Sequence, residues 1–229
     1  MAEPAGALFD MDGTLVDREP LMTAAVVEVM AETHLPVPHD VAAGWVGRAW
    51  SDIHDELGVH RVLGWDLATW HGHILVAAER LAAEGFGVRQ LTGGGALIVR
   101  LATAGVPVAV VTGSTLPEVA TVLDLLGVAD HVSAVVASGD YARGKPDPEP
   151  FRLGAERLGV DPARCVAFED SAAGVAAALA AGSTVIATDE ANAPVGHAAH
   201  QVLDAAHLVV GSLAEVTDEV LADLLGGAP

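Results

Sequence analysis

Short apolar runs alternate with longer segments of helical spacing along most of this chain. Apolar runs of this length, rich in Val and Ala, are typical of strands that are buried on both faces of a sheet. The six runs that predict strands are AGALFD (5–10), VPVAVVT (106–112), VSAVVAS (132–138), CVAFED (165–170), STVIAT (183–188) and HLVV (207–210). Between them, Leu, Val and Ala recur at helical spacing, which predicts helices over 96–104, 115–127, 148–158 and 172–181.

The predicted helices end at glycines, which often stop a helix because they adopt a left-handed backbone at low cost. These residues are Gly105, Gly127, Gly159 and Gly182. Strand–helix–strand alternation with doubly buried strands predicts a doubly wound α/β core, that is, a Rossmann-like parallel sheet. Ligands of such sheets bind beyond the carboxyl ends of the strands. Asp10, Thr112 and the pair Glu169–Asp170 fall at predicted strand ends, so we expect them at one edge of the sheet.

Residues 18–88 break this alternation, because the segment shows helical spacing but no strand pattern. All four tryptophans of the chain lie within it: Trp45, Trp50, Trp65 and Trp70. The shift in composition predicts an inserted helical subdomain over 18–88, between core segments 1–17 and 89–229. Most of the tryptophans are expected to form the core of this small subdomain, because a short bundle needs bulky side chains. The tail, 211–229, is predicted to form one final amphipathic helix that ends before GGAP.

Composition and charge narrow the possible partners of the chain. Its 229 residues are 52% hydrophobic but only 4% aromatic, as expected for a Val-rich sheet covered by Ala- and Leu-rich helices. The 31 acidic residues outnumber the 11 basic ones, and a net charge of −20 argues against nucleic acids and anionic membranes as partners. The chain has a single cysteine, and its sequence shows neither a basic, apolar leader nor an apolar segment long enough to span a membrane. These features predict a soluble cytoplasmic protein. The oligomeric state stays open between monomer and homodimer.

Asp10 and Asp12 stand two residues apart at the end of the first predicted strand, and the chain can turn at Gly13. Both carboxylates can then reach one pocket, where one attacks a phosphorus atom and the other protonates the leaving oxygen. Carboxylates repel a phosphate group, so this chemistry requires a hard cation. Glu169 and Asp170 supply oxygen ligands of the type that Mg²⁺ binds in proteins.

Two further segments complete the charges and donors that phosphoryl transfer needs. Thr112-Gly113-Ser114, at the end of the second predicted strand, offers hydroxyl and backbone N–H groups to phosphoryl oxygens. Lys145 is the only lysine among the 11 basic residues, and its compact ammonium can screen both the nucleophile and the transferred group. Each segment alone also occurs as a turn, a helix cap or a solvated pair. Their combination, in this order and at strand ends, predicts a phosphoryl-transfer site.

The segments FDMDGTLVD, VVTGS, GKPDPEPF and FEDSAAGV resemble the four ordered motifs of the haloacid dehalogenase superfamily. The resemblance covers nearly the whole chain and points to the β-phosphoglucomutase-like phosphatases, whose helical cap is inserted just after the first motif. It implies that 18–88 is the cap, that Asp10 is the nucleophile forming an aspartyl-phosphate, and that Asp12 is the general acid and then the general base. It further implies that Thr112 binds the phosphate and that the positive charge of Lys145 stabilises the nucleophile and the transferred group. Mg²⁺ would be bound by Asp10, by the carbonyl oxygen of Asp12 and by Asp170, with Glu169 as an adjacent or water-mediated ligand.

The resemblance also separates neighbouring activities. Dehalogenases of the superfamily lack the second aspartate, so Asp12 favours phosphoryl transfer. Members that cleave phosphonoacetaldehyde use a lysine of the cap, and residues 18–88 contain none. We therefore expect a Mg²⁺-dependent phosphatase whose partner is a small phosphorylated metabolite, namely a sugar or polyol phosphate. The candidate substrate contacts from the cap are Arg18, Arg48 and Trp50.

Two alternatives stay open. Mutases similar to this chain carry a His and an Arg in the cap, at positions that here hold Met22 and, if Gly47 is the loop glycine, Trp50. Arg48 is close enough to substitute for that arginine, so a hexose-phosphate mutase of the β-phosphoglucomutase type is the first alternative. A non-catalytic protein that binds a phosphorylated metabolite is the second. The intact catalytic set argues against the second, because a binding module has no use for a nucleophile beside its own acid.

Overall fold

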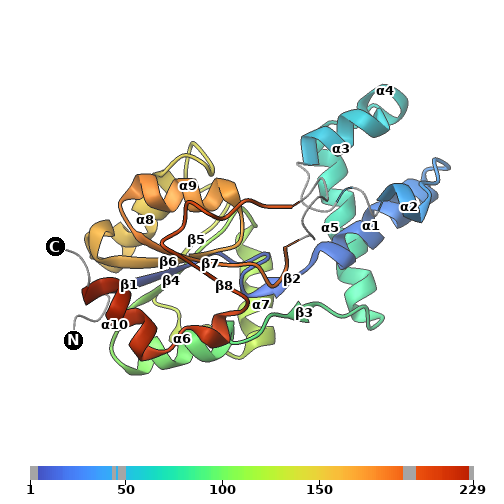
Figure 1. Cartoon of the computed structure of the whole chain (residues 1–229). Coiled ribbons are helices and arrows are strands. Elements are labelled where there is room, and N and C mark those ends of the chain that lie inside the picture. Colours follow the sequence, from blue (N-terminus) through green and yellow to red (C-terminus); the bar gives the residue numbers. More distant parts are fainter. Residues whose placement is uncertain (1–4, 43–44, 46–49, 193–199, 227–229) are drawn as a thin grey trace. The chain divides into compact units, whose positions relative to one another are not determined.

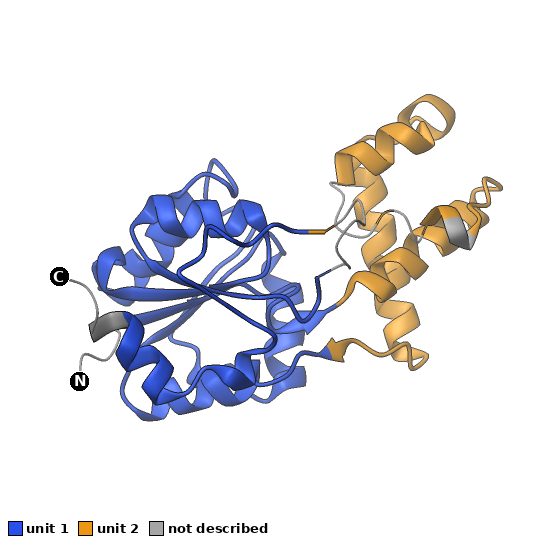
Figure 2. Cartoon of the chain, viewed as in Figure 1, with its two compact units in different colours: residues 1–17, 90–192, 201–229 blue, residues 18–89, 193–200 orange. Residues whose placement is uncertain are grey.

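The computed structural model describes residues 5–42, 45, 50–192 and 200–226 of the chain. The chain divides into two compact units (Figure 2). Unit 1 contains Met1–Asp17, Gln90–Asn192 and Gln201–Pro229, and unit 2 contains Arg18–Arg89 and Ala193–His200. Two strands of two residues each, β2 (Val16–Asp17) and β3 (Arg89–Gln90), form a small separate sheet where the chain passes from one unit to the other. Neither of these strands was predicted from the sequence, because two residues carry no periodicity.

The sheet of unit 1 has six strands, and every neighbouring pair is parallel. The strands are β1 (Gly6–Phe9), β4 (Val108–Val111), β5 (Ala134–Val136), β6 (Cys165–Glu169), β7 (Thr184–Thr188) and β8 (Leu208–Val210). Their order is β5-β4-β1-β6-β7-β8, so β1 lies between β4 and β6 in the middle of the sheet. The predicted doubly wound parallel sheet is therefore confirmed, and each predicted strand is present within one or two residues of its expected bounds.

Helices cover both faces of this sheet. α8 (Glu149–Leu158) and α9 (Ala172–Ala181) lie on one face, whereas α6 (Gly94–Thr103), α7 (Leu116–Leu126) and α10 (Asp218–Gly226) lie on the other (Figure 1). Short 3₁₀ helices occur at η2 (Ala129–His131), η3 (Pro162–Arg164) and η4 (Leu213–Glu215). The prediction of one continuous helix over the tail is wrong. Ser212 and Glu215 cap η4 with their own side chains, and α10 begins only at Asp218.

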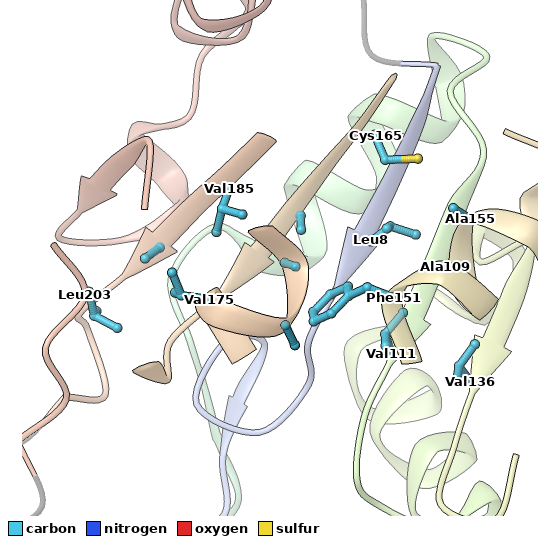
Figure 3. Close-up of a cluster of buried hydrophobic side chains, with 14 residues drawn as sticks. Leu8, Ala109, Val111, Val136, Phe151, Ala155, Cys165, Val175, Val185 and Leu203 are labelled. Carbon is cyan, nitrogen blue, oxygen red and sulfur yellow. The ribbon is translucent and has the colours of Figure 1, made fainter. Parts of the chain in front are cut away.

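The central strands are buried along their whole length because both of their faces are covered. On the face toward α8 and α9, side chains of the strands and of both helices form one buried cluster, in which Phe151 of α8 lies with Leu8, Val111 and others (Figure 3). Helix α8 comes close to the sheet at Gly154. A Cβ atom at this position would lie 2.8 Å from Cγ2 of Val111 and 3.2 Å from Cδ2 of Leu8. This close approach positions the loop before α8, which carries Lys145.

Unit 2 is helical, as predicted for this stretch. Its described helices are α1 (Glu19–Glu32), α2 (His39–Ala42), α3 (Trp50–Leu57), α4 (Val59–Leu63) and α5 (Leu67–Ala83). They enclose a separate hydrophobic core in which Trp70 and Trp45 are buried, while Trp50 and Trp65 pack against it. The expectation that most of the tryptophans form this core is confirmed. Among the described residues of the whole chain, no helix combines the length and the apolar character that crossing a membrane requires.

Gly154→Ala should lower the free energy of unfolding by about 1–3 kcal/mol, because the added methyl group overpacks the contact of α8 with β1 and β4. Alanine is the better helix former, so propensity alone predicts the opposite sign. Gly72→Ala in α5 is the matched control. Apart from its two chain neighbours and the backbone of its own helix, no atom of the described structure lies within 4 Å of the added methyl group there, and the change should stabilise by about 0.5–1 kcal/mol. Urea unfolding of both variants tests this difference, and a Gly154→Ala protein at least as stable as the parent would contradict the packing argument.

Candidate active site

Strand pairing brings the polar strand ends together at one edge of the sheet of unit 1. Asp10 follows β1, and its backbone N–H donates a hydrogen bond of 2.9 Å to the carbonyl oxygen of Phe168 in β6. The register of this pair is anchored by Phe9 and Phe168, whose rings stack with centroids 4.4 Å apart. Thr112 follows β4 on the other side of β1, and its backbone N–H donates to Val136 in β5. Residues that are far apart in the sequence thereby end up on adjacent strands.

Lys145 joins the three central strands through its ammonium group. Its Nζ donates to Oδ1 of Asp10 at 2.5 Å, to Oε1 of Glu169 at 2.6 Å and to the carbonyl oxygen of Val111 at 3.1 Å. The Phe151 ring lies below it, with the centroid 4.9 Å from Nζ, in a cation–π contact. These contacts use the three hydrogens of the ammonium group, so Lys145 holds a defined position beside the Asp10 carboxylate.

Glu169 is completely buried, and both of its carboxylate oxygens are hydrogen-bonded. Oε1 accepts from Lys145, whereas Oε2 accepts from the backbone N–H of Asp170, at 2.9 Å, and from the N–H and hydroxyl groups of Ser171, both at 3.0 Å. The carboxylate lies against the first turn of α9, where a Cβ atom on Gly174 would come within 1.8 Å of Oε1. Glycine at this position therefore makes room for the buried carboxylate.

The turn after Asp12 depends on a second glycine. Gly13 has a φ of +89°, in the left-handed region, and a Cβ atom there would lie 1.9 Å from Oδ2 of Asp170. Thr14 follows, is buried, and donates its hydroxyl to Oδ1 of Asp170 at 3.1 Å. The first motif thus folds directly against the Asp170 carboxylate, which could not approach so closely if residue 13 carried a side chain.

The segment Thr112-Gly113-Ser114 forms a tight loop at the carboxyl end of β4. The hydroxyl of Ser114 donates to Oδ2 of Asp12 at 2.6 Å, and its backbone N–H donates to Oγ1 of Thr112 at 3.0 Å. Tyr141, which sequence reasoning missed, donates its hydroxyl to the carbonyl oxygen of Thr112 at 3.2 Å. It is the only tyrosine of the chain and lies four residues before Lys145, but no spacing rule connects it to Thr112.

The carboxylates fit a divalent cation. Oxygen atoms of Asp10, Glu169 and Asp170 all lie within 4.8 Å of one another. These three groups carry three negative charges against the single positive charge of Lys145, so two negative charges remain, which equals the charge of Mg²⁺. Since both oxygens of Glu169 are taken by hydrogen bonds, Asp10 and Asp170 are the carboxylates that can ligate such an ion directly. The sequence-based assignment of Asp12 concerns its carbonyl oxygen and stays a prediction.

The excess of buried negative charge changes the acidity of these groups. Burial raises the pKa of Asp10 to about 7, Lys145 opposes this rise, and the Glu169 carboxylate adds to it. Burial likewise raises the pKa of Asp170 well above its ordinary value, and the charges of Glu169 and Asp10 act in the same direction. For Lys145, burial alone lowers the pKa, but the carboxylates of Asp10 and Glu169 more than offset this and raise it. The ammonium group therefore stays charged throughout the physiological range.

The three candidate residues from the inserted segment do not belong to unit 1. Arg18 directly precedes α1, and its carbonyl oxygen accepts a hydrogen bond from the backbone N–H of Met22. Trp50 is half-buried in unit 2, with its ring 6.0 Å from that of Trp70 and 5.5 Å from that of His71. Arg48 lies outside the described residues. A substrate-binding role for these residues therefore stays a prediction.

Asp10→Asn should stabilise the metal-free protein at pH 8 by about 1–4 kcal/mol. The folded-state pKa of Asp10, about 7, lies above its ordinary value of 3.8, so the wild-type protein loses stability as the pH rises from about 4 to about 7. Asparagine removes this loss, and the gain should nearly vanish at pH 4. Asp189→Asn is the control, because Asp189 is an exposed carboxylate after β7. Thermal unfolding in EDTA at both pH values provides the measurement, and a destabilised Asp10→Asn protein at pH 8 would refute the argument.

Comparison with known proteins agrees with this geometry. The family model for haloacid dehalogenase-like hydrolases matches residues 4–182. The chain is similar to hexitol phosphatase A of Escherichia coli (strain K12), with 35% identity over 216 residues that cover 93% of each chain. It is also similar to phosphoglycolate phosphatase of Yersinia pseudotuberculosis serotype I (strain IP32953), with 31% identity over 189 residues and 79% of each chain.

The fold is similar to that of a solved structure, the HAD hydrolase, family IA, variant 3, of Entamoeba histolytica HM-1:IMSS. The TM-score is 0.78 at 21% identity, and the match covers 97% of this chain and 99% of the other. The family model spans most of the chain and includes all four motifs that meet at the edge of the sheet. This protein belongs to the haloacid dehalogenase-like hydrolases.

Proposed function

We propose that this chain is a Mg²⁺-dependent phosphatase that hydrolyses a small phosphorylated metabolite, a sugar or polyol phosphate, through an aspartyl-phosphate on Asp10. That the enzyme is a phosphoric monoester hydrolase follows from its family and from relatives that are named phosphatases. The observation that supports the mechanism is the meeting of Asp10, Asp12, Lys145 and Asp170 at one edge of the sheet. The similarity to hexitol phosphatase A over 93% of each chain supports the substrate class.

The first step is the attack of Asp10 on phosphorus. Oδ1 of Asp10 accepts a hydrogen bond from Lys145, so we assign the attack to Oδ2. The new bond joins this oxygen to phosphorus while the bond from phosphorus to the alcohol oxygen breaks. The Lys145 ammonium keeps Asp10 oriented and offsets the charge of the transferred group. Mg²⁺, when bound by Asp10 and Asp170, supplies the positive charge that reduces the repulsion between carboxylates and phosphate.

The second carboxylate handles the protons. Ser114 holds Asp12 beside the Thr112-Gly113-Ser114 loop through the hydrogen bond of 2.6 Å between its hydroxyl and Oδ2 of Asp12. Asp12 gives a proton to the departing alcohol oxygen and then takes one from the water that attacks the aspartyl-phosphate. That attack breaks the bond between phosphorus and Asp10, releases inorganic phosphate and restores the carboxylate. The side chain of Asp12 thus acts first as an acid and then as a base.

The mutase alternative is less well supported than hydrolysis. The positions at which similar mutases carry cap residues hold Met22, which is buried in the core of unit 2, and Trp50, which packs beside Trp70. Neither side chain can transfer a proton as a histidine does or bind a phosphate group through a positive charge as an arginine does. The non-catalytic alternative has to explain why Lys145 holds a buried nucleophile-type carboxylate beside Asp12, and a binding role does not.

The proposal is tested by phosphate release in the presence of Mg²⁺ from a panel of sugar, polyol and small-acid phosphates. Asp10→Asn should lower kcat/KM by at least about 10³-fold for every substrate, because the variant lacks the nucleophile. Asp189→Asn is the control; it makes the same chemical change at the end of β7 and should leave activity unchanged. Release that survives in Asp10→Asn would exclude the aspartyl-phosphate. Faster conversion of β-glucose 1-phosphate to glucose 6-phosphate than phosphate release would instead indicate the mutase.

Binding of Mg²⁺ should stabilise the wild-type protein. At a concentration 100 times the dissociation constant, the gain is about 2.7 kcal/mol, which corresponds to a rise in Tm of several degrees. Asp170→Asn should remove most of this rise, because it deletes one of the two carboxylates available as ligands. The Asp189→Asn protein should retain the full rise. An equal response to Mg²⁺ in the Asp170→Asn and wild-type proteins would contradict the assigned site.

A further inference from the structure

The first turn of α7 lies next to the groups that we assign to the leaving alcohol. The hydroxyl of Ser114 contacts the Asp12 carboxylate at 2.6 Å, and Asp12 is the proposed proton donor to that alcohol. Helix α7 starts only two residues after Ser114, at Leu116, with Thr115 as its N-cap. The residues that open α7 therefore follow directly on the residue that contacts Asp12.

The N-terminal end of α7 is capped by the carboxylate of Glu118, a residue of the same helix. Oε2 of Glu118 accepts hydrogen bonds from the backbone N–H of Thr115 at 2.8 Å and from its hydroxyl at 2.6 Å. Pro117 occupies the first turn and has no N–H to offer. A helix start usually attracts an anion through its N–H groups, but here the protein's own negative charge already lies there. A second anion at this place would meet repulsion.

The side chain that α7 presents first is apolar. Leu116 is 61% exposed, among the most exposed large hydrophobic residues of the described chain. Its neighbours toward Asp12 are Thr115 and Ser114, which are uncharged. An apolar side chain flanked by hydroxyl groups suits the carbon chain and hydroxyl groups of a polyol. The hydroxyls of Ser114 and Thr115 already donate to Asp12 and Glu118, and the leucine side chain itself provides neither a positive charge nor a hydrogen-bond donor for a carboxylate or a second phosphate.

Unit 1 supplies no spare cation for such a second anion within its described residues. Lys145 is bound to Asp10 and Glu169. Arg143, on the same loop, pairs with Asp147 at 3.3 Å and with Glu149 at 3.5 Å. Arg164 directly precedes β6 and so lies at the opposite, amino edge of the sheet. The remaining arginines have these partners: Arg100 with Asp218, Arg152 with the Ala180 carbonyl, and Arg157 with Asp140.

We propose that Glu118 and Leu116 make this enzyme selective for phosphate esters whose leaving alcohol is uncharged. Esters of a neutral polyol or sugar are accepted, whereas esters whose leaving group carries a carboxylate or a second phosphate are disfavoured. The inference rests on the proposed phosphatase function and deepens it. Of the substrates named for the two similar phosphatases, it favours a hexitol phosphate, whose alcohol is neutral, over phosphoglycolate, whose alcohol carries a carboxylate.

The experiment uses substrate pairs that differ in charge but little in size. The first pair is 2-hydroxyethyl phosphate and phosphoglycolate, and the second is a hexitol monophosphate and the corresponding bisphosphate. The wild-type protein should show a higher kcat/KM for the neutral member of each pair. Glu118→Gln should shift this ratio toward the anionic member by about fivefold, because it removes one nearby negative charge while Gln still forms the capping box.

A matched control exists in the same unit. Glu215 forms the equivalent capping box with Ser212 after β8, at the far edge of the sheet from β4. Glu215→Gln makes the same change in charge and in capping, so it should leave the ratio unchanged. Leu116→Lys, at an exposed position, should shift the ratio in the same direction as Glu118→Gln by supplying a cation. Both shifts should shrink at 1 M salt, where exposed charges are screened.

The outcomes separate the two proposals. A wild-type preference for the anionic members, or a ratio that Glu118→Gln and Leu116→Lys leave unchanged, would overturn the selectivity while the phosphatase function stands. Equal shifts in Glu118→Gln and Glu215→Gln would also overturn it, because the effect would then come from net charge or from capping. The absence of Asp10-dependent release from every ester would overturn the phosphatase function and the selectivity together.

Discussion

The structure of unit 1 depends on keeping two buried carboxylates and one half-buried carboxylate close together beside one ammonium group. Such a cluster is expensive, because burial favours the neutral form of each acid and the like charges repel one another. Lys145 offsets part of the cost by hydrogen bonds to Asp10 and Glu169, and the start of α9 offsets more by three hydrogen bonds to Glu169. A divalent cation between Asp10 and Asp170 would balance the remaining charge. The raised pKa of Asp10 means that the folded protein is less stable when this buried carboxyl group is ionised.

Several features of the fold serve this cluster. The order of the strands places β1 between β4 and β6, which brings Asp10, Thr112 and Glu169 to adjacent strand ends. Gly13 and Gly174 remove side chains where Asp170 and Glu169 must approach the backbone. Gly154 lets α8 settle on the sheet and so sets the position of the loop that carries Lys145. Gly13 and Gly154 are required by neighbours that are distant in the sequence, whereas Gly174 makes room for Glu169, five residues before it.

The fold was largely predictable because both faces of the central strands are buried. Runs such as VPVAVVT therefore stand out, and the structure contains a strand within each of the six predicted runs. The convergence of Asp10, Thr112 and Glu169 followed from the rule that parallel strands end at one edge. The hydrogen bond of Tyr141 was not predictable, since it depends on how a loop closes and not on periodicity. The capping box of Thr115 and Glu118 has a sequence signature, a Thr followed three residues later by Glu, but it was not among the predictions. The strands β2 and β3 were not predicted because two residues carry no periodicity, and the break before α10 was missed because the capping box of Ser212 and Glu215 ends the hydrophobic pattern there.

The position of β1 in the middle of the sheet has a consequence for how the protein is made. Its neighbours β4 and β6 lie about 100 and 160 residues further along the chain, so β1 leaves the ribosome long before either of them is available. Until β6 has been synthesised, the apolar strand β1 lacks its partner on that side. The contact of Thr14 with Asp170 spans 156 positions, so this part of the candidate site cannot form before residue 170 has been synthesised. A nascent chain therefore carries Asp10 early, but the candidate site can assemble only after Asp170 has been synthesised.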